Sequence, residues 1–438
     1  MTVTDRHATA SQSDLVDEIR SWLADNWDPD LTVAEWWERL GLAGWSHPSL
    51  PTNAYGRDLS RSDANLVAKE IAAHGALGAP GGLGLLLAAP TIATHGTQEQ
   101  IDTFVRDIVT GQRAWCQLFS EPGAGSDLAG LSARAELDGD EWVVNGQKVW
   151  TSLGQSADMG MLIARTAPDA PKHQGITWFA IDMHQPGVDV RPLIELTGHA
   201  MFNEVFLTDA RVPAGDNIGD VNNGWAVTNT TLMHERAGLG SGGGSAGGGV
   251  TPGTVADQLG RRVGDTIAAP TTRSRPNPAE ARRKSMLQSY ADQHAKTDDP
   301  LIRQDLARLH TLNEIGRFNT ERSKAARAAG RDIPGMANIG KLSMSHIVRL
   351  TRDLGLQLAG PAGTLHAYDD AGRAALDEAT GDPLLAMITF QALYAQAPPI
   401  YGGTDQIQRN IIAERVLGLP KEPGDNKHIP FSELPKNG

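Results

Sequence analysis

The sequence predicts an α+β fold in which a β domain lies between two helical domains. Apolar residues recur with helical spacing through about the first hundred residues, short β-prone runs fill about the next hundred, and helical spacing returns at Trp225. Because the two kinds of segment are separated along the chain, the order argues against a doubly wound parallel sheet. We expect an N-terminal helical domain over residues 1–115, a middle β-barrel or sandwich domain over 116–220 and a C-terminal helical bundle over 221–438.

The N-terminal helical prediction depends on an amphipathic start and on two later runs with helical spacing. The first segment is rich in tryptophan and contains Trp22, Trp27, Trp36 and Trp37. The later runs, Leu66–Ile71 and Ile101–Val105, repeat apolar residues at the spacing that places them on one face of a helix.

The middle domain is predicted from β-prone segments separated by turn residues. Within Trp142–Trp150, the pair Asn145-Gly146 lies between two β-prone arms and predicts a two-residue hairpin turn. Further strands are expected within Gly175–Met183 and Asn203–Leu207.

The C-terminal helical region contains a glycine-rich insertion, Gly238–Gly253, and a polar stretch, Thr271–Arg283, that we expect to be an exposed loop. The insertion includes a nominal G-x-G-x-x-G at Gly238, Gly240 and Gly243. A dinucleotide fingerprint needs a preceding strand, and a helical pattern precedes this one, so we interpret the tract as a flexible insertion.

The composition excludes several classes of function. A formal net charge of −13 argues against general nucleic-acid binding, which relies on a basic surface. The single cysteine, Cys116, cannot form an internal disulfide, and no metal is expected. No apolar run approaches the roughly 18 residues of a membrane helix, and Met1–Ser13 lacks the apolar core of a secretory signal. We expect a cytoplasmic protein without nucleic-acid or membrane partners.

Three segments carry the first group of candidate site residues. Phe119–Gly130 is rich in glycine and can offer backbone amides to an anionic or polar ligand, although an ordinary turn has the same composition. Lys148–Ser152 closes the β-prone run around Trp150, and Ile400–Asn410 contains Y-G-G-T-D-Q-I-Q.

These segments resemble the signatures of the acyl-CoA dehydrogenase family. Ser120–Asp127 is similar to S/T-E-P-x-A-G-S-D, and Tyr401–Gln408 is similar to Y-E-G-T-x-Q-I-Q. The resemblance extends over nearly the whole chain, from His95–Gln100 to Gln406–Arg409. It implies FAD as the cofactor and conversion of an acyl-CoA thioester to the trans-2-enoyl-CoA, by α-proton removal and hydride transfer to flavin N5.

The resemblance also implies cofactor contacts around the β domain. The residues that it assigns to the flavin are Phe119, Ser120, Gly125, Ser126, Trp150 and Ser152. Trp150 would cover one face of the ring, Ser152 would bond near its N5 and O4 edge, and Ser126 would meet the substrate or its CoA portion. A core aromatic and a turn cap are the alternative roles of Trp150 and Ser126. Thr404 and Gln406 would reach the adenylate side of the cofactor, with helix capping as their alternative role.

A further segment departs from the family pattern. Gln357–Gly363 resembles the Q-x-x-G-G-x-G loop, in which Gln357, Leu358 and Gly360 would bind the FAD pyrophosphate of a neighbouring subunit. Pro361 replaces a glycine there and removes one amide donor. His294 stands where the family has an arginine, so FAD is held less tightly or another residue such as Lys296 substitutes.

The catalytic glutamate of most relatives is absent, because Gly402 occupies its position. Glu235, within Leu232–Arg236, resembles the glutamate that branched-chain and long-chain members carry on the first helix after the β domain. We therefore expect Glu235 to be the base, with Arg236 orienting CoA or a buried carboxylate. An exposed ion pair is the alternative role of Glu235, and His234 is the competing base, although it points about 100° away on a helix.

Gly402 keeps a backbone N–H that would bind the thioester oxygen, and its missing side chain would leave room for a bulky or branched acyl chain. The expected partners are an acyl-CoA, an electron-transferring flavoprotein, and further subunits in a homodimer, a homotetramer or a heterotetramer with a paralogous chain. Two other functions remain open: a non-catalytic FAD- or acyl-CoA-binding subunit, and an acyl-CoA oxidase.

Overall fold

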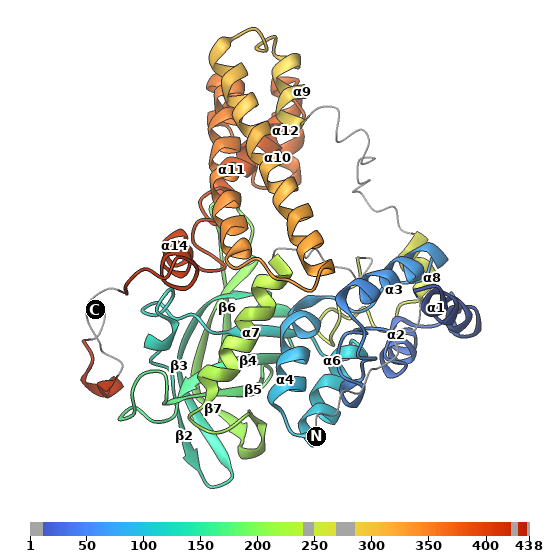
Figure 1. Ribbon diagram of the computed structural model, residues 1–438, viewed down its shortest axis with the longest axis vertical. Helices are drawn as coiled ribbons and strands as arrows, with labels where there is room; N and C mark the ends of the chain where they lie inside the picture. Colours follow the sequence, from blue (N-terminus) through green and yellow to red (C-terminus); the bar gives the residue numbers. More distant parts are fainter. Residues whose placement is uncertain (1–11, 240–248, 269–284, 422–427, 436–438) are drawn as a thin grey trace.

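The computed structural model describes residues 12–239, 249–268, 285–421 and 428–435. It confirms the order of helices, strands and helices (Figure 1). The N-terminal helices lie to one side of a sheet, α7 crosses one face of that sheet, and the C-terminal helices rise from it as a tall bundle. Residues 240–248 of the expected insertion Gly238–Gly253, and the whole of the expected loop Thr271–Arg283, lie outside the described residues.

The N-terminal domain is built from short helices around a tryptophan-rich core. The helices are α1 (Gln12–Asn26), α2 (Val33–Leu42), α3 (Arg61–His74), α4 (Ala89–His95), α5 (Gln98–Gln100) and α6 (Arg106–Val109). Trp36 and Trp37 are fully buried, and their indole N–H groups donate to Leu77 O at 2.7 Å and to Gly78 O at 2.8 Å. Both rings therefore bury their large apolar surface without leaving a donor unpaired.

A segment that follows α7 in the chain completes this N-terminal core. Residues 250–268, which include α8 (Val263–Ala268), run back to α2. Val33 N donates to Arg261 O at 2.8 Å and Val263 N donates to Leu31 O at 2.9 Å. Val250 and Val263 are buried in the same apolar cluster as the tryptophans.

The middle domain is one eight-stranded sheet. Its strands are β1 (Trp115–Leu118), β2 (Arg134–Asp138), β3 (Glu141–Ser152), β4 (Met159–Arg165), β5 (Ile176–Asp182), β6 (Val188–Leu193), β7 (Phe202–Pro213) and β8 (Asn217–Ile218). The order is β6-β7-β3-β2-β4-β5-β8, and β1 pairs with β4 in parallel. The Trp142 ring of β3 packs on Phe179 of β5 with centroids 5.4 Å apart, so the sheet curves over its own apolar core.

The predicted hairpin turn at Asn145-Gly146 is wrong. β3 continues through these residues, with an irregular register opposite β7, and the Asn145 side chain bonds Asp209 at 3.0 Å. Gly146 is required because a Cβ there would lie 2.5 Å from the Cβ of Ala133. The turn between β2 and β3 is Gly139-Asp140, where Gly139 has a φ of 69°.

The helix α7 (Gly224–Leu239) packs between the sheet and the N-terminal helices. Val227 joins an apolar cluster that is shared by β4, β5 and α4. The hydroxyl groups of Thr91 in α4 and Thr231 in α7 lie 3.1 Å apart and are buried. These contacts fix α7 against the face of the sheet.

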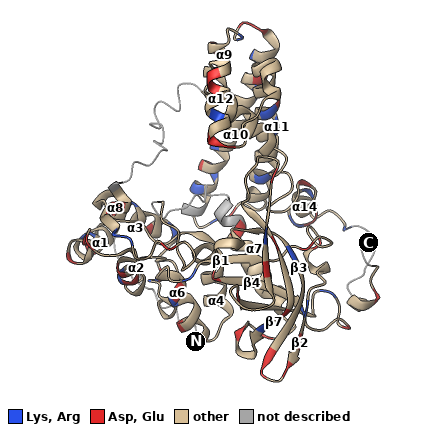
Figure 2. Cartoon of the chain, turned by 180° about the vertical axis from the view of Figure 1, so that it is seen from behind, with Lys and Arg blue, Asp and Glu red and all other residues tan. Residues whose placement is uncertain are grey.

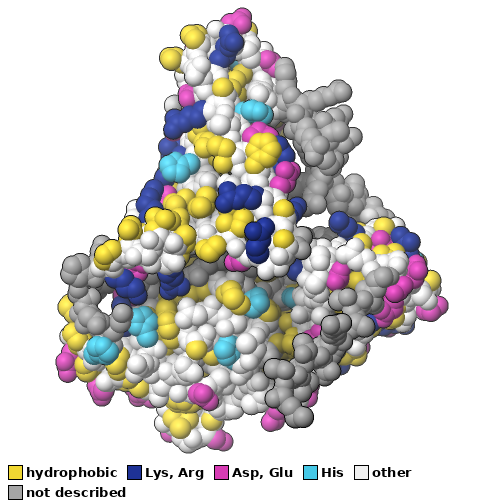
Figure 3. Space-filling view, viewed as in Figure 1, with side chains coloured by type: hydrophobic (Ala, Val, Ile, Leu, Met, Phe, Trp, Pro, Cys, Tyr) yellow, Lys and Arg dark blue, Asp and Glu magenta, His cyan; other side chains and the backbone are white. Residues whose placement is uncertain are grey.

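The C-terminal helices form a bundle with a small core. They are α9 (Met286–Gln293), α10 (Pro300–Ala328), α11 (Met336–Ala359), α12 (Asp370–Thr380), α13 (Leu385–Tyr394) and α14 (Asp405–Ile411). The buried cluster here includes Leu287, Tyr290 and Ile388, whereas Phe318 of α10 is 57% exposed. Apolar side chains appear among cations on the bundle surface (Figure 3), and both signs of charge occur along its helices (Figure 2).

The last described segment, residues 428–435, returns to the sheet domain. Phe431 N donates to Ala170 O at 2.9 Å, and the Arg165 guanidinium lies 3.8 Å from the centre of the Phe431 ring. The chain end is thereby attached near the Phe119–Gly130 segment, because Arg165 also donates to Ala129 O at 2.6 Å.

Candidate active site

The segment Phe119–Gly130 directly follows β1 and begins with a tight turn. Glu121 and Ala124 exchange backbone hydrogen bonds of 3.0 Å, and Phe119 is buried. Val149 N of β3 donates to Ser120 O at 2.9 Å. The fold therefore brings the first and second sequence motifs side by side, as the resemblance implies.

A buried ion pair, which sequence reasoning missed, fixes this turn. Lys148 is fully buried, and its Nζ donates to Glu121 Oε1 at 2.8 Å and to Phe119 O at 3.1 Å. The Glu121 carboxylate also accepts from Ser132 N at 2.6 Å and Ala133 N at 2.9 Å. Burial lowers the pKa of Lys148, and the charge of Glu121 opposes that effect. A lysine within a β-prone segment, directly before Val149-Trp150, was the available signal.

Trp150 lies at an irregular point of β3. The pairing of β3 with β7 shifts between Lys148 and Thr151, and Trp150 has a φ of 61°. A large side chain rarely adopts this left-handed conformation, and such residues cluster at functional sites. The Trp150 ring is 61% exposed and packs edge-on against Phe202, so the structure does not give it the alternative role of a core aromatic. Ser152 is half-buried at the end of β3.

Glu235 lies near the end of α7. Its half-buried carboxylate faces β1, where Gln117 Nε2 donates to Glu235 Oε2 at 3.4 Å. The preceding residue, His234, is also half-buried, and burial lowers its pKa. Arg236 belongs to α7, but its side chain lies outside the described part of the chain.

The third motif reaches the first through a contact between two hydroxyl groups. Ser126 Oγ lies 3.5 Å from Thr404 Oγ1, although the residues are 278 positions apart. Thr404 is also the N-cap of α14 and accepts from Ile407 N. Gly402 has a φ of 62°, a conformation that favours glycine, and Gln406 is exposed. Capping is thus one role of Thr404, and its contact with Ser126 is a second.

The helix α14 is anchored to α11 through a buried carboxylate. Asp405 accepts from Ser345 Oγ at 2.7 Å and pairs with Lys341 and Arg349, both at 3.3 Å. Burial raises the pKa of Asp405, but the hydrogen bonds and the two cations outweigh it, so the pKa lies below its ordinary value. This cluster holds the Gly402–Thr404 segment against the bundle.

The Gln357–Gly363 turn contacts its own bundle. Lys296 Nζ donates to Gln357 O at 3.2 Å and to Leu358 O at 2.8 Å, which are carbonyls at the end of α11. His294 Nε2 lies 3.2 Å from Asp382 Oδ2. Gln357 is exposed, the Leu358 side chain is buried, and Gly360 has a φ of 62°.

The exposed Trp150 ring and the glycine-rich turn after β1 fit a planar, phosphate-bearing cofactor such as FAD. The exposed Trp150 ring lies one residue beyond the Val149 contact to Ser120, where an aromatic surface is open to stacking. A Cβ added at Gly123 or Gly125 would meet no atom within 4 Å, so the turn leaves its backbone open to a ligand.

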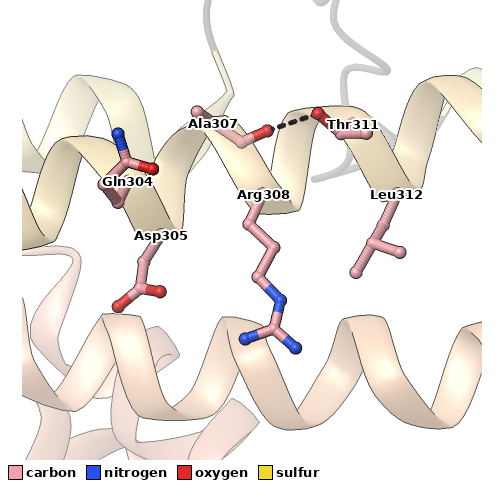
Figure 4. Close-up of a pocket in the computed structure, with 6 residues that line it drawn as sticks. All are labelled: Gln304, Asp305, Ala307, Arg308, Thr311 and Leu312. Atoms are coloured by element: carbon pink, nitrogen blue, oxygen red, sulfur yellow. Dashed lines mark hydrogen bonds between the residues drawn. The ribbon is translucent and has the colours of Figure 1, made fainter.

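Other features of the described chain give no competing site. A groove of about 540 Å³ opens along α10 near Asp305, Arg308 and Leu312, whose side chains extend toward the adjacent helix (Figure 4), and no motif residue lines it. Within the described ranges, no group of three metal-ligating side chains converges. None of the described helices is long and apolar enough to cross a bilayer.

Comparison with known families accounts for all three domains. The chain matches the acyl-CoA dehydrogenase N-terminal domain over residues 9–112, the middle domain over 116–210 and the C-terminal domain over 284–417.

Named relatives match most of the chain. Acyl-CoA dehydrogenase IpdE1 of Mycobacterium tuberculosis is 34% identical, with 92% of this chain and 97% of the relative covered. Acyl-CoA dehydrogenase FadE34 of the same organism is 36% identical, with 84% of this chain and 44% of that longer protein covered.

Two solved structures share the fold. The "Tcur3481-Tcur3483 steroid ACAD" is 25% identical with a TM-score of 0.65, and 95% of this chain and 99% of that chain are covered. The ChsE4-ChsE5 complex from Mycobacterium tuberculosis is 26% identical with a TM-score of 0.60, and 95% and 100% are covered. Together with the relatives, these matches identify the chain as a member of the acyl-CoA dehydrogenase family, an FAD-dependent oxidoreductase that acts on acyl-CoA.

Proposed function

We propose that Glu235 is the base that removes the α-proton of the bound acyl-CoA. The observation that carries this assignment is the contact of Glu235 with Gln117, two residues before Phe119 on the strand that leads into the first motif. A carboxylate partly withdrawn from water is a stronger base toward carbon than one in bulk solvent. Gly402 has no side chain to take the proton, so another element must supply the base.

The cofactor contacts that we propose follow the motifs. They are Phe119, Ser120, Gly125, Ser126, Trp150 and Ser152 at the flavin, and Thr404 and Gln406 at the adenylate side. Gln357, Leu358 and Gly360 are proposed to contact the pyrophosphate of a neighbouring subunit's FAD. When bound, FAD supplies the acceptor for the β-hydrogen, while the chain orients the substrate and moves the α-proton.

The thioester oxygen is assigned to the backbone N–H of Gly402. An enolate develops on this oxygen as the α-proton leaves, and a fixed N–H donor stabilises the growing negative charge. The φ of 62° at Gly402 is a conformation that a glutamate would adopt only under strain. Arg236 is proposed to orient the CoA portion, and Ser126 to meet the substrate.

The substrate that we propose carries a bulky or ring-bearing acyl group. The missing side chain at Gly402 supports this choice, as does the similarity of the chain to a solved structure that is named a steroid ACAD. The base on α7 would then leave the space beside the α-carbon open.

We also propose that this protein assembles with a second subunit. Its proposed electron acceptor is an electron-transferring flavoprotein, and its proposed location is the cytoplasm. The similar ChsE4-ChsE5 structure is a complex of two differently named chains, which supports a paralogous partner. His294 and Pro361 depart from the family pattern at the neighbouring-subunit contact, which gives such a partner a reason to supply the missing groups.

The replacement Glu235→Gln tests the base. We expect FAD content to remain and the rate at which acyl-CoA bleaches the flavin to fall by about 10⁴-fold, because the amide cannot accept the α-proton. His234→Gln is the matched control on the same helix turn and should keep the rate within about threefold. Normal bleaching by Glu235→Gln would falsify the assignment.

The same bleaching assay, run with ring-bearing and short linear acyl-CoAs, tests the substrate class. Faster bleaching by ring-bearing substrates is expected. Turnover confined to short linear chains would contradict it.

A further inference from the structure

Gln117 is a polar side chain on an apolar face of β1. Its neighbours Cys116 and Leu118 belong to the core inside the curved sheet, whereas Trp115 and Phe119 belong to the apolar cluster beneath α7. Because side chains alternate along a strand, Gln117 lies on the same face as Trp115 and Phe119. The fold thus directs one amide toward α7, where it meets the Glu235 carboxylate at 3.4 Å.

A neutral amide suits a carboxylate that must remain a base. A lysine or arginine at this distance would stabilise the charged form strongly and would lower the pKa of Glu235. An amide N–H fixes the carboxylate with a smaller effect on its pKa, since it carries no net charge.

His47 interacts electrostatically with His234, the residue before Glu235. Burial is the main cause that lowers the pKa of His47, to about 4, and His234 contributes by charge repulsion. Burial also lowers the pKa of His234. The His234 ring, which directly precedes Glu235 on α7, is therefore neutral at neutral pH.

We infer that Gln117 is a positioning residue that holds the Glu235 carboxylate at a fixed position relative to the Phe119–Ser120 turn. This inference depends on the proposed role of Glu235 as the base. Gln117 and Phe119 are two residues apart on one chain segment, so the contact links the base to the same backbone that enters the flavin motif. The distance between base and cofactor is then set by β1 and does not depend on α7 alone.

The replacement Gln117→Met removes the donor and keeps the length of the side chain. We expect unchanged FAD content and a bleaching rate about tenfold lower at saturating acyl-CoA. The pH at which this rate is half-maximal, its pH midpoint, should be about one unit higher. The midpoint rises because the charged form of Glu235 loses a hydrogen bond. Gln117→Glu keeps the shape but adds a second carboxylate, so its midpoint should rise further.

Gln147→Met is the matched control. Gln147 Nε2 donates to Glu204 Oε1 at 3.1 Å, an equivalent amide–carboxylate pair between β3 and β7. Its loss should leave both the rate and the pH midpoint unchanged.

The outcomes separate this inference from the assignment of the base. If Glu235→Gln is inactive but both Gln117 variants keep the wild-type rate and midpoint, the positioning role is overturned and the base stands. If Glu235→Gln bleaches normally, the base is wrong and the positioning role fails with it. Adding Gln117→Met to Glu235→Gln should cause no further loss, because the bond has already lost its charged acceptor.

Discussion

The sheet and the bundle carry two parts of the candidate site and hold them by different means. On the sheet, the turn before Gly125 is fixed by the buried pair of Lys148 and Glu121. On the bundle, the Gln357–Gly363 turn has an exposed Gln357 and ends a helix whose last carbonyls bond Lys296. The turn before Gly125 is fixed by buried charge, whereas the Gln357–Gly363 turn lies at the surface.

This difference suggests which part of the candidate site is held by contacts within one subunit and which part depends on a neighbouring subunit. The sheet part has its flavin motif and the proposed base linked through contacts within one chain. In the bundle, His294 Nε2 already lies against Asp382 Oδ2, so this ring nitrogen is engaged inside the subunit. We therefore expect loss of the buried pair in the sheet to abolish cofactor binding, and changes in the Gln357–Gly363 turn to act mainly on stability and assembly.

The largest expected effect comes from breaking the buried pair. Lys148→Met leaves the Glu121 carboxylate buried without its cation and should cost about 3–5 kcal/mol in the free energy of unfolding, with loss of FAD. Urea unfolding and the flavin absorbance of the purified protein measure both effects. Lys172→Met breaks the more exposed pair with Asp127 and should cost less than about 1 kcal/mol. Equal losses in the two variants would remove the distinction between buried and exposed pairs.

The second largest effect is expected from acidification, which lowers the free energy of unfolding through His47. The pKa of His47 is lowered from 6.5 to about 4, so the unfolded chain takes up a proton more readily than the folded one. The stability that neutral His47 contributes is complete above pH 6.5 and is lost as the pH falls toward 4, by about 3 kcal/mol. Melting temperatures over this range measure the loss, and His47→Gln should flatten the slope. An unchanged slope in that variant would show that other groups are responsible.

The smallest expected effect compares two helix caps. Thr404→Ala in the third motif and Ser285→Ala at the start of α9 each remove an N-cap and should each cost about 1 kcal/mol in the free energy of unfolding. Only Thr404→Ala should also weaken FAD binding, because Thr404 meets Ser126. Titration of the FAD-free proteins with FAD measures the difference. Equal FAD affinity in both variants would show that Thr404 acts only as a helix cap.

The sequence predicted the elements whose signals are local. The order of domains and the strand around Ile176–Asp182 agree with the structure. The error at Asn145-Gly146 arose because the same dipeptide that favours a tight turn also fits a crowded point within a strand.

The missed site features depend on partners far apart in the sequence. Gln117 meets Glu235 across 118 positions, and Glu121 meets Lys148 across 27. No local pattern pairs such residues, since only the folded sheet brings them together. The roles of the motif residues came from family resemblance, and the structure adds how their backbone is held.

The return of residues 250–268 to the N-terminal helices has a consequence for synthesis on the ribosome. The core around Trp36 receives Val250 and Val263 only after about 260 residues have been made, and the whole sheet emerges before then. Part of the apolar surface of the N-terminal helices therefore stays exposed to solvent while the sheet folds. A nascent chain of this protein should accordingly bind chaperones through its first domain for longer than the position of that domain suggests.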